Sequence, residues 1–194
     1  MEVDPNAYYS SDIAVSSYDL IAGSGILKGD IDFYLECAKR FKGPILELGA
    51  GTGRIAIPLA KAGHRIVGMD LSPAMLKLAI AKRNANPDIA DRVAFIEGNM
   101  KDFDLDELFS LTLLPARAFQ HLITPTDQRA CLTGIRRHLV TGGHVVIDMF
   151  DPNFELILGK TVTPPREITD PVSGHKREPG IHPDRQLNDG RWKR

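Results

Sequence analysis

Residues 45–54, ILELGAGTGR, place three glycines within five positions directly after a short apolar run. In an open α/β sheet, the turn from the first strand into the first helix usually forms the floor of the ligand site. Glycine has no Cβ, so the backbone here can take a positive φ and a ligand can approach it closely. The helix that follows would present free N–H groups with partial positive charge. The stretch therefore predicts a site for a flat or anionic part of a ligand at the end of a first strand.

The spacing of these glycines separates the known kinds of nucleotide-binding turn. They follow G-x-G-x-G at Gly49, Gly51 and Gly53, and Arg54 stands where the dinucleotide fingerprint has its third glycine. No Gly-Lys-Ser/Thr follows, which excludes a phosphate-cradling P-loop. For Arg54 itself we expect a salt bridge at the surface or a position over the helix end. Because the third glycine of the dinucleotide fingerprint is missing, a nicotinamide-dependent oxidoreductase is only a weak alternative function for this chain.

Short apolar runs alternate with helical periodicity on both sides of this turn. We expect strands at 44–48, 64–70, 92–98, 109–115 and 144–150, and helices over 27–43, 54–63 and 72–85. A further helix should begin at Thr124 and stop at Gly142 and Gly143, with a buried stripe at Leu132, Ile135 and Leu139. The pattern predicts an α/β fold: a doubly wound, mostly parallel, Rossmann-like sheet with helices on both faces.

The segment 161–194 differs from the rest, because it holds five prolines, three glycines and few large apolar residues. Such a composition allows hairpins or a loose tail but not two more buried strands. The C-terminal strand pair of the sheet should then be incomplete, which would leave the strand at 144–150 as an exposed apolar edge. The tail could lie loosely over this edge. We expect instead that a second copy covers it, as in a homodimer, or that the chain is a truncated product.

Composition narrows the setting and the partners. The formal net charge is −1, and the clearest local bias is acidic, so we expect no nucleic-acid partner. No run nears the roughly 18 apolar residues of a membrane span, and the acidic N-terminus is unlike a signal peptide. The two cysteines, Cys37 and Cys131, fit neither a disulfide framework nor a metal site. We expect a cytoplasmic protein without membrane partner or bound metal.

Four motifs in order resemble those of the class I S-adenosylmethionine-dependent methyltransferases, of the small-molecule, methyltransferase-domain type. They are the acidic residue and glycines of 47–53, Asp70 in GMDLSPAML, EGNMKDF at 97–103, and LPARAFQHL at 114–122 with the later segment 136–152. The family more often has Asp where this chain has Asn99, and its sheet normally has seven strands. The resemblance covers about residues 15–155. It implies an N-terminal lid segment at 1–27, an S-adenosylmethionine-binding domain at 28–160 and a Pro-rich, irregular tail at 161–194.

The resemblance implies cofactor contacts at Glu47, Gly49, Ala50, Gly51, Gly53, Asp70, Leu71, Asn99, Met100, Pro115 and Tyr18. Asp70 ends a strand, where a carboxylate can accept both hydroxyls of a ribose; alternatively, the helix beginning at Ser72 satisfies it. Glu47 is expected to be buried and so needs a partner, either the methionine amino group or a structural ion pair. Asn99 would accept from the adenine amine, and the Met100 N–H would donate to the ring.

The cofactor's sulfonium is an activated methyl donor, so alignment supplies most of the acceleration in this chemistry. His121, just past the fourth strand, is the candidate proton acceptor, although it could simply hydrogen-bond a backbone carbonyl. Tyr18 and Asp19 would either cover the methionine end or form a surface turn. The strand-four segment, Leu114 to Arg117, lacks the Asn-Pro-Pro-aromatic turn of enzymes that methylate bases or amides.

The sequence thus predicts a methyltransferase that acts on a nitrogen or oxygen of a small molecule. A binding module for S-adenosylmethionine or S-adenosylhomocysteine without turnover, whether a pseudoenzyme or a fragment, stays open. In this family, the acceptor pocket is often built partly from the strand pair that follows the fifth strand, and the composition of the tail does not fit such a pair.

Overall fold

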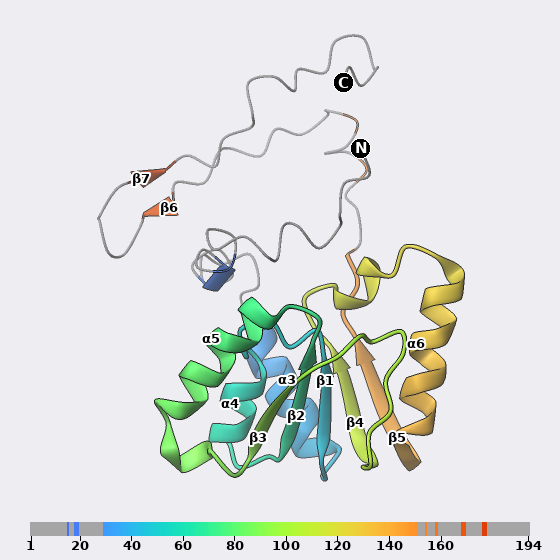
Figure 1. Cartoon of the computed structure of the whole chain (residues 1–194), viewed down its shortest axis with the longest axis horizontal. Helices are drawn as coiled ribbons and strands as arrows, with labels where there is room; N and C mark the ends of the chain where they lie inside the picture. The colour runs from blue at the N-terminus through green and yellow to red at the C-terminus, as the bar shows by residue number, and fades with distance from the viewer. Residues whose placement is uncertain are drawn as a thin grey trace. The chain divides into compact units, whose positions relative to one another are not determined.

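Five parallel strands in the order β3-β2-β1-β4-β5 form the central sheet (Figure 1). They are β1 (Ile45–Leu48), β2 (Ile66–Asp70), β3 (Val93–Glu97), β4 (Phe109–Leu114) and β5 (Leu139–Ile147). Every neighbouring pair is parallel, and the order reverses direction between β1 and β4. That reversal is the position at which open α/β sheets bind their ligands. The predicted doubly wound sheet is confirmed.

The computed structural model describes Val15, Tyr18, Asp19, residues 29–150, Phe154, Leu158 and the pairs 168–169 and 176–177. The chain divides into two compact units, residues 1–150 and 151–194. Among the described residues of both units, no helix is long and apolar enough to span a membrane. The functional division into lid, domain and tail drawn from the sequence stays a prediction.

Helices cover both faces of the sheet. The main ones are α3 (Asp30–Arg40), α4 (Ala56–Lys61), α5 (Pro73–Asn84) and α6 (Pro125–Arg137), with short 3₁₀ turns η2 (Pro87–Ile89) and η3 (Ala118–His121). One buried cluster joins α3 and α4 to β1, β2 and β4, whereas the other joins α6 and η3 to the opposite face. Burial of apolar side chains on both faces explains why the central strands are apolar along their whole length.

Two helix starts are capped as the sequence predicts. The Ser72 hydroxyl accepts from the Met75 N–H at 3.3 Å, and Pro73 is the first residue of α5. The Thr124 hydroxyl accepts from the Asp127 N–H at 3.1 Å, and a proline again opens the helix. Each cap satisfies a backbone donor that the first helical turn leaves open. The cap of α5 matters most for function, because it fixes the chain directly after Asp70.

The predicted end of the last helix is wrong. Helix α6 ends at Arg137, and Gly142 and Gly143 lie inside β5. The expected buried stripe is also shifted: Leu132 is 43% exposed, and the buried residues of α6 are Cys131, Gly134 and Ile135. Gly134 sits against the Phe103 ring, where an added Cβ would come within 2.8 Å. The helix therefore packs through Ile135, as predicted, and through two small residues, Cys131 and Gly134, which a search for large apolar residues overlooks.

The outer edge of β5 has no strand paired to it among the residues that the structure describes. In the second unit, β6 (Ile168–Thr169) and β7 (Lys176–Arg177) form a separate antiparallel ladder of two residues each. Neither of these two short strands pairs with the main sheet. Val140 and Val145 of β5 are more than one-third exposed, so the edge strand is partly open.

Candidate functional site

The three glycines of the turn after β1 serve different purposes. Gly51 has φ 53°, lines a cavity, and has only the Tyr18 ring, at 4.0 Å, near the place of a Cβ. Gly53, with φ 76°, packs into the interior, where a Cβ would lie 2.8 Å from the Phe95 ring. A Cβ at Gly49 would lie 2.7 Å from that of Ala118. The close approach that the sequence predicts is thus concentrated at Gly51, and Gly53 allows α4 to pack on the sheet.

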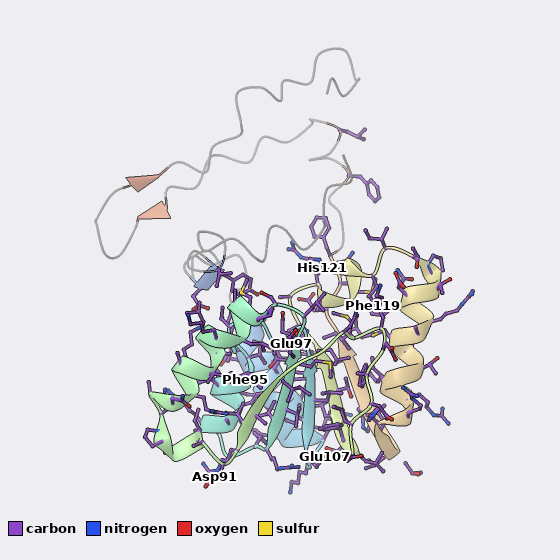
Figure 2. All side chains as sticks on the ribbon, viewed as in Figure 1. Asp91, Phe95, Glu97, Glu107, Phe119 and His121 are labelled. Atoms are coloured by element: carbon purple, nitrogen blue, oxygen red, sulfur yellow. The ribbon has the colours of Figure 1, made fainter. Side chains whose placement is uncertain are left out.

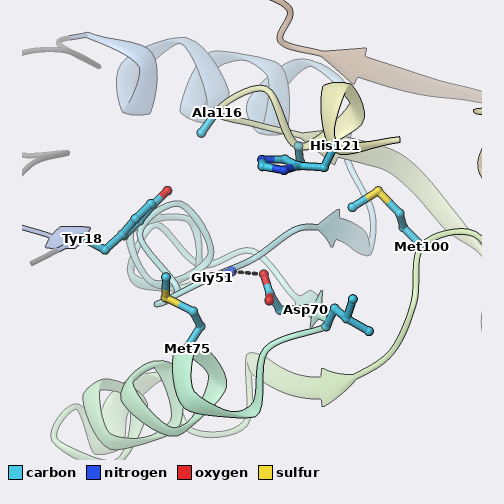
Figure 3. Close-up of a pocket in the computed structure, with 9 residues that line it drawn as sticks. Tyr18, Gly51, Asp70, Met75, Met100, Ala116 and His121 are labelled. Atoms are coloured by element: carbon cyan, nitrogen blue, oxygen red, sulfur yellow. Dashed lines mark hydrogen bonds between the residues drawn. The ribbon is translucent and has the colours of Figure 1, made fainter. Parts of the chain in front are cut away.

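Asp70 ends β2 and turns its carboxylate toward Gly51 (Figure 3). Its Oδ2 accepts from the Gly51 N–H at 2.7 Å, and its Oδ1 accepts from the Ser72 N–H at 2.8 Å. Burial raises the Asp70 pKa, whereas backbone N–H donors and the nearby His121 favour the charged form. Each oxygen keeps a second lone pair, so the group can still accept two hydroxyls. Both predicted settings of Asp70, the helix start and the cavity wall, are present together.

Two adjoining cavities lie at the carboxyl ends of the strands, with volumes of about 160 and 380 Å³. Asp70, Leu71, Met100 and His121 line both of them. Tyr18 lines only the smaller cavity and Asn99 only the larger one. Figure 2 shows His121 at the carboxyl ends of the strands, and Asp91 and Glu107 at the opposite end of the sheet. The arrangement is an elongated site with Asp70 in its middle.

Glu47 lies under the glycine turn and is 1% exposed. Burial raises its pKa to about 8, although the Arg54 charge and a hydrogen bond from the Ala56 N–H oppose the shift. Its Oε2 has no hydrogen-bond partner among the described residues. An unpaired buried carboxyl oxygen is costly, so a cationic or donor group of a ligand would satisfy it. Among the described residues, no ion pair accounts for the burial of Glu47. Its predicted partner, the amino group of a ligand, stays a prediction.

Asn99 and Met100, which the sequence assigns to the adenine, lie in the loop after β3, and their role stays a prediction. The Asn99 Oδ1 accepts from the Lys101 N–H at 3.0 Å, and Asn99 forms an isolated bridge with Asp102. One lone pair of that oxygen is therefore used within the loop, and the other stays open to a donor. Met100 lines the larger cavity together with Asn99, and it also lines the smaller one.

Some predicted positions support the site without lining it. Glu47, Ala50, Gly53 and Pro115 are absent from both cavity walls. The Pro115 carbonyl accepts from the Ala118 N–H at 3.0 Å and so closes the turn after β4. Within that turn, Ala116 and Arg117 have φ values of 49° and 66°, a conformation that side chains other than glycine rarely adopt.

Arg54 is not the surface residue that we expected. Its side chain is 13% exposed and forms two hydrogen bonds with Asp30, at 2.9 and 2.6 Å. Its charge also acts on the Tyr18 hydroxyl and opposes the rise in the Tyr18 pKa that burial causes. Asp30 carried no sequence signal, because it meets Arg54 only when α3 packs beside the turn.

Further residues at the site were missed, and seven of them line the larger cavity: Met69, Gly98, Lys101, Leu122, Ile123, Thr124 and Asp127. Met75, Ala116 and Ala118 line the smaller cavity, and Lys82 reaches Asp19 from the far end of α5. Met75 lies one turn after the predicted N-cap Ser72, so the start of α5 was a usable signal for it. Figure 3 shows Tyr18 and Met100 at opposite ends of this cavity, with His121 and Asp70 between them.

Comparison with known proteins gives one consistent result. A family model described as a methyltransferase domain matches residues 45–143, slightly more than half of the chain. The chain is 30% identical over 151 residues to the cypemycin N-terminal methyltransferase of a Streptomyces species, which covers 77% of this chain and 58% of that protein.

Two solved structures extend the comparison. The glycopeptide N-methyltransferase MtfA in complex with S-adenosyl-L-methionine is 28% identical, with a TM-score of 0.56 over 60% of this chain and 48% of MtfA. SAM-bound CalS10, an amino pentose methyltransferase from Micromonospora echinaspora, is 26% identical, with a TM-score of 0.55 over 72% of this chain and 57% of CalS10. The chain thus spans roughly half of the length of these relatives.

Proposed function

The chain belongs to the methyltransferase domain family, and from this premise we propose that it transfers a methyl group from S-adenosylmethionine to an amine nitrogen of a small molecule. The observation that carries the proposal is the line of groups at the strand ends. Open Gly51 and twice-bonded Asp70 line one elongated site, and buried Glu47, whose Oε2 has no partner among the described residues, lies under the same glycine turn without lining the cavities. The size and polarity of this line fit a nucleoside joined to an amino acid.

The residues present fit the cofactor from end to end. Asp70 would accept the ribose hydroxyls with its remaining lone pairs, and the absence of a side chain at Gly51 leaves room for the sugar. Asn99 and Met100 would hold the adenine in the larger cavity. The free Oε2 of Glu47 would receive the ammonium of the amino acid end. When bound, the cofactor supplies an activated methyl group, so the chain's main task is to align the acceptor.

The choice of an amine acceptor is supported by the relatives. Their names specify an N-terminal methyltransferase, a glycopeptide N-methyltransferase and an amino pentose methyltransferase. An amine must be neutral when it attacks, and His121 lies in both cavities, where it can take the proton. The formal net charge of −1 favours a small acceptor over a nucleic acid.

A binding module without turnover is the second candidate. The observation that favours it is the outer edge of β5, which has no strand paired to it among the described residues, in the region where this family often builds part of its acceptor pocket. Calorimetric titration with S-adenosylhomocysteine, together with a methyl-release assay on a panel of small amines, separates the two. Binding with turnover supports the enzyme, whereas binding without turnover on any amine supports the module. Binding of NADH instead would favour the oxidoreductase alternative.

We also propose that two copies associate through the outer edge of β5 and that the protein works in the cytoplasm. The outer edge of β5, which has no strand paired to it among the described residues, and the partly exposed Val140 and Val145 support the first point. The two cysteines, both free thiols, are consistent with the second.

A further inference from the structure

Arg54 connects three segments that lie far apart in the sequence. It follows the glycine turn, and its guanidinium makes a two-pronged contact with Asp30, the first residue of α3, at 2.9 and 2.6 Å. Both side chains are less than one-fifth exposed. The same guanidinium lies close enough to the Tyr18 hydroxyl to oppose the rise in the Tyr18 pKa that burial causes. A planar, forked cation with a fixed carboxylate partner holds a third group more precisely than a lysine could.

The residue after Tyr18 is tied to the same turn. The Asp19 Oδ1 accepts from the Thr52 hydroxyl at 2.5 Å, and its Oδ2 pairs with the Lys82 ammonium. Lys82 also donates to the Thr52 carbonyl at 3.1 Å. Two consecutive residues, Tyr18 and Asp19, are therefore held by two residues of the turn, Thr52 and Arg54. This arrangement fixes the Tyr18 ring as a wall of the smaller cavity.

The Tyr18 side of the site is the side away from the adenine residues. Asn99 lines only the larger cavity, Tyr18 lines only the smaller one, and Asp70 belongs to both. If Asp70 holds the ribose, then the amino acid end of the cofactor extends toward Tyr18 and Glu47. Arg54 lies close enough to both residues to influence their ionisation.

The charge of Arg54 also acts on Glu47 directly. The charged and titratable groups that face Glu47 are Arg54, Asp70, Tyr18 and Tyr34. Of these, only Arg54 lowers the Glu47 pKa, against the much larger effect of burial. An ionised Glu47 is the form that attracts an ammonium group. Loss of Arg54 would therefore both release Tyr18 and disfavour the form of Glu47 that binds the ligand.

We propose that Arg54, fixed by Asp30, is a positioning residue for the amino acid end of the cofactor: it holds the Tyr18 wall and supplies positive charge beside Glu47. The inference rests on the proposed function, because it presupposes that S-adenosylmethionine occupies the site. It goes further in assigning the two ends of the ligand to different supports. The nucleoside end depends on Asp70 and Gly51, and the amino acid end depends on Arg54.

Two ligands test this division. S-adenosylhomocysteine carries both ends, whereas 5′-methylthioadenosine has the same nucleoside and sulfur without the amino acid. In Arg54→Met, affinity for S-adenosylhomocysteine should fall about tenfold or more, as expected for the loss of a charge-assisted contact. Affinity for methylthioadenosine should stay within about threefold of wild type. Arg65→Met is the matched control, because Arg65 pairs with Glu107 at the opposite edge of the sheet and should change neither affinity.

The pH profile adds a readout that a purely structural role would not move. In Arg54→Met, the rise of S-adenosylhomocysteine affinity with pH should shift to higher pH, because Glu47 keeps its proton longer. Asp30→Asn and Tyr18→Phe should weaken S-adenosylhomocysteine selectively and less strongly, and they report on the same network if Arg54→Met does not fold. Arg54→Lys should recover the pH profile but only part of the affinity.

The outcomes are distinct. Equal loss of both ligands in the folded variants, or no loss of either, would overturn the inference while leaving the proposed function intact. If the wild-type protein binds neither ligand, the proposed function is itself wrong, and the assignment of Arg54 falls with it.

Discussion

Glu47 and Asp70 are neighbouring carboxylic acids whose surroundings differ. Glu47 is almost completely buried, one of its oxygens lacks a partner among the described residues, and its pKa is raised to about 8. Burial also raises the Asp70 pKa, but backbone N–H groups of the turn and of α5 bond to its charged form. Without ligand, Glu47 is therefore mainly neutral at pH 7, and binding of an ammonium group favours release of its proton.

Glu47 should make stability depend on pH in a definite direction. The unfolded chain loses this proton near the ordinary pKa of 4.5, whereas the folded protein keeps it until about pH 8. The contribution of Glu47 to the free energy of unfolding is therefore full below pH 4.5. Between pH 4.5 and about pH 8 it falls by up to about 1.4 kcal/mol per pH unit. Glu47→Gln lacks this dependence, so the variant should gain stability relative to wild type as pH rises from 5 to 8. Urea unfolding of both proteins at several pH values measures the difference, and a constant difference would refute the assignment.

Glu47→Gln should also separate stability from function. The amide keeps an oxygen for the Ala56 N–H but cannot become an anion. We therefore expect S-adenosylhomocysteine affinity to fall about tenfold at pH 7.5 while the free energy of unfolding rises at the same pH. Calorimetry checks the affinity. Unchanged binding would show that the amino acid end of the ligand lies elsewhere.

His121 should affect turnover more than binding. If His121 accepts the proton of an amine, His121→Asn should lower kcat about 100-fold at pH 7. Part of the activity should return at higher pH, where the amine is already neutral. S-adenosylhomocysteine affinity serves as the control and should change only slightly. A folded variant with normal kcat would instead favour the structural alternative, a hydrogen bond from His121 to its surroundings.

The element that carries the site is the turn between β1 and α4, and its glycines can be told apart by experiment. Gly53→Ala would push a Cβ to within 2.8 Å of the Phe95 ring and 3.1 Å of Ile57. We expect it to lower the free energy of unfolding by about 2–3 kcal/mol. Gly51→Ala places a Cβ in ordinary contact with the Tyr18 ring, at 4.0 Å, and should cost only about 1 kcal/mol for its positive φ, yet block the ligand. Thermal unfolding and calorimetry check both variants; equal stability losses would contradict the distinction.

The sequence predicted those features of the turn and its neighbouring helix that a few adjacent residues define, but not the contacts between residues far apart in the chain. The cap at Ser72, the position of Asp70 at a strand end and the glycine turn are each defined by a few adjacent residues, and the structure has them as predicted. The Arg54 and Asp30 pair is 24 residues apart, and the Lys82 and Asp19 pair is 63 apart. Such contacts exist only after the helices pack, so no spacing rule could indicate them.

The end of α6 illustrates a different limit. Two adjacent glycines normally stop a helix, and here they lie in a strand because the helix already ends at Arg137. His138 follows, with its Nδ1 2.7 Å from the Gly134 carbonyl and its Nε2 accepting from the Leu105 N–H at 2.8 Å. A buried histidine that bonds two backbone groups terminates the helix in place of a glycine. That role depends on a loop 33 residues away.

For the molecule as a whole, the open edge of β5 is the feature with the clearest consequence. If two copies pair there, light scattering after size exclusion should give a mass above the 21.4 kDa of one chain, rising with concentration. Val145→Lys places a charge on this partly exposed strand and should shift the mass toward the monomer. A wild-type protein that stays monomeric at all concentrations would rule out this interface.

The central claim is that Asp70 holds a ribose next to the open backbone of Gly51. A crystal structure of the protein with S-adenosylhomocysteine tests it most directly. We predict that both ribose hydroxyls lie within hydrogen-bonding distance of the Asp70 carboxylate, with adenine on the Asn99 side and the amino group at Glu47. A ligand bound with its sugar away from Asp70, or no ligand at all at saturating concentration, would contradict the account.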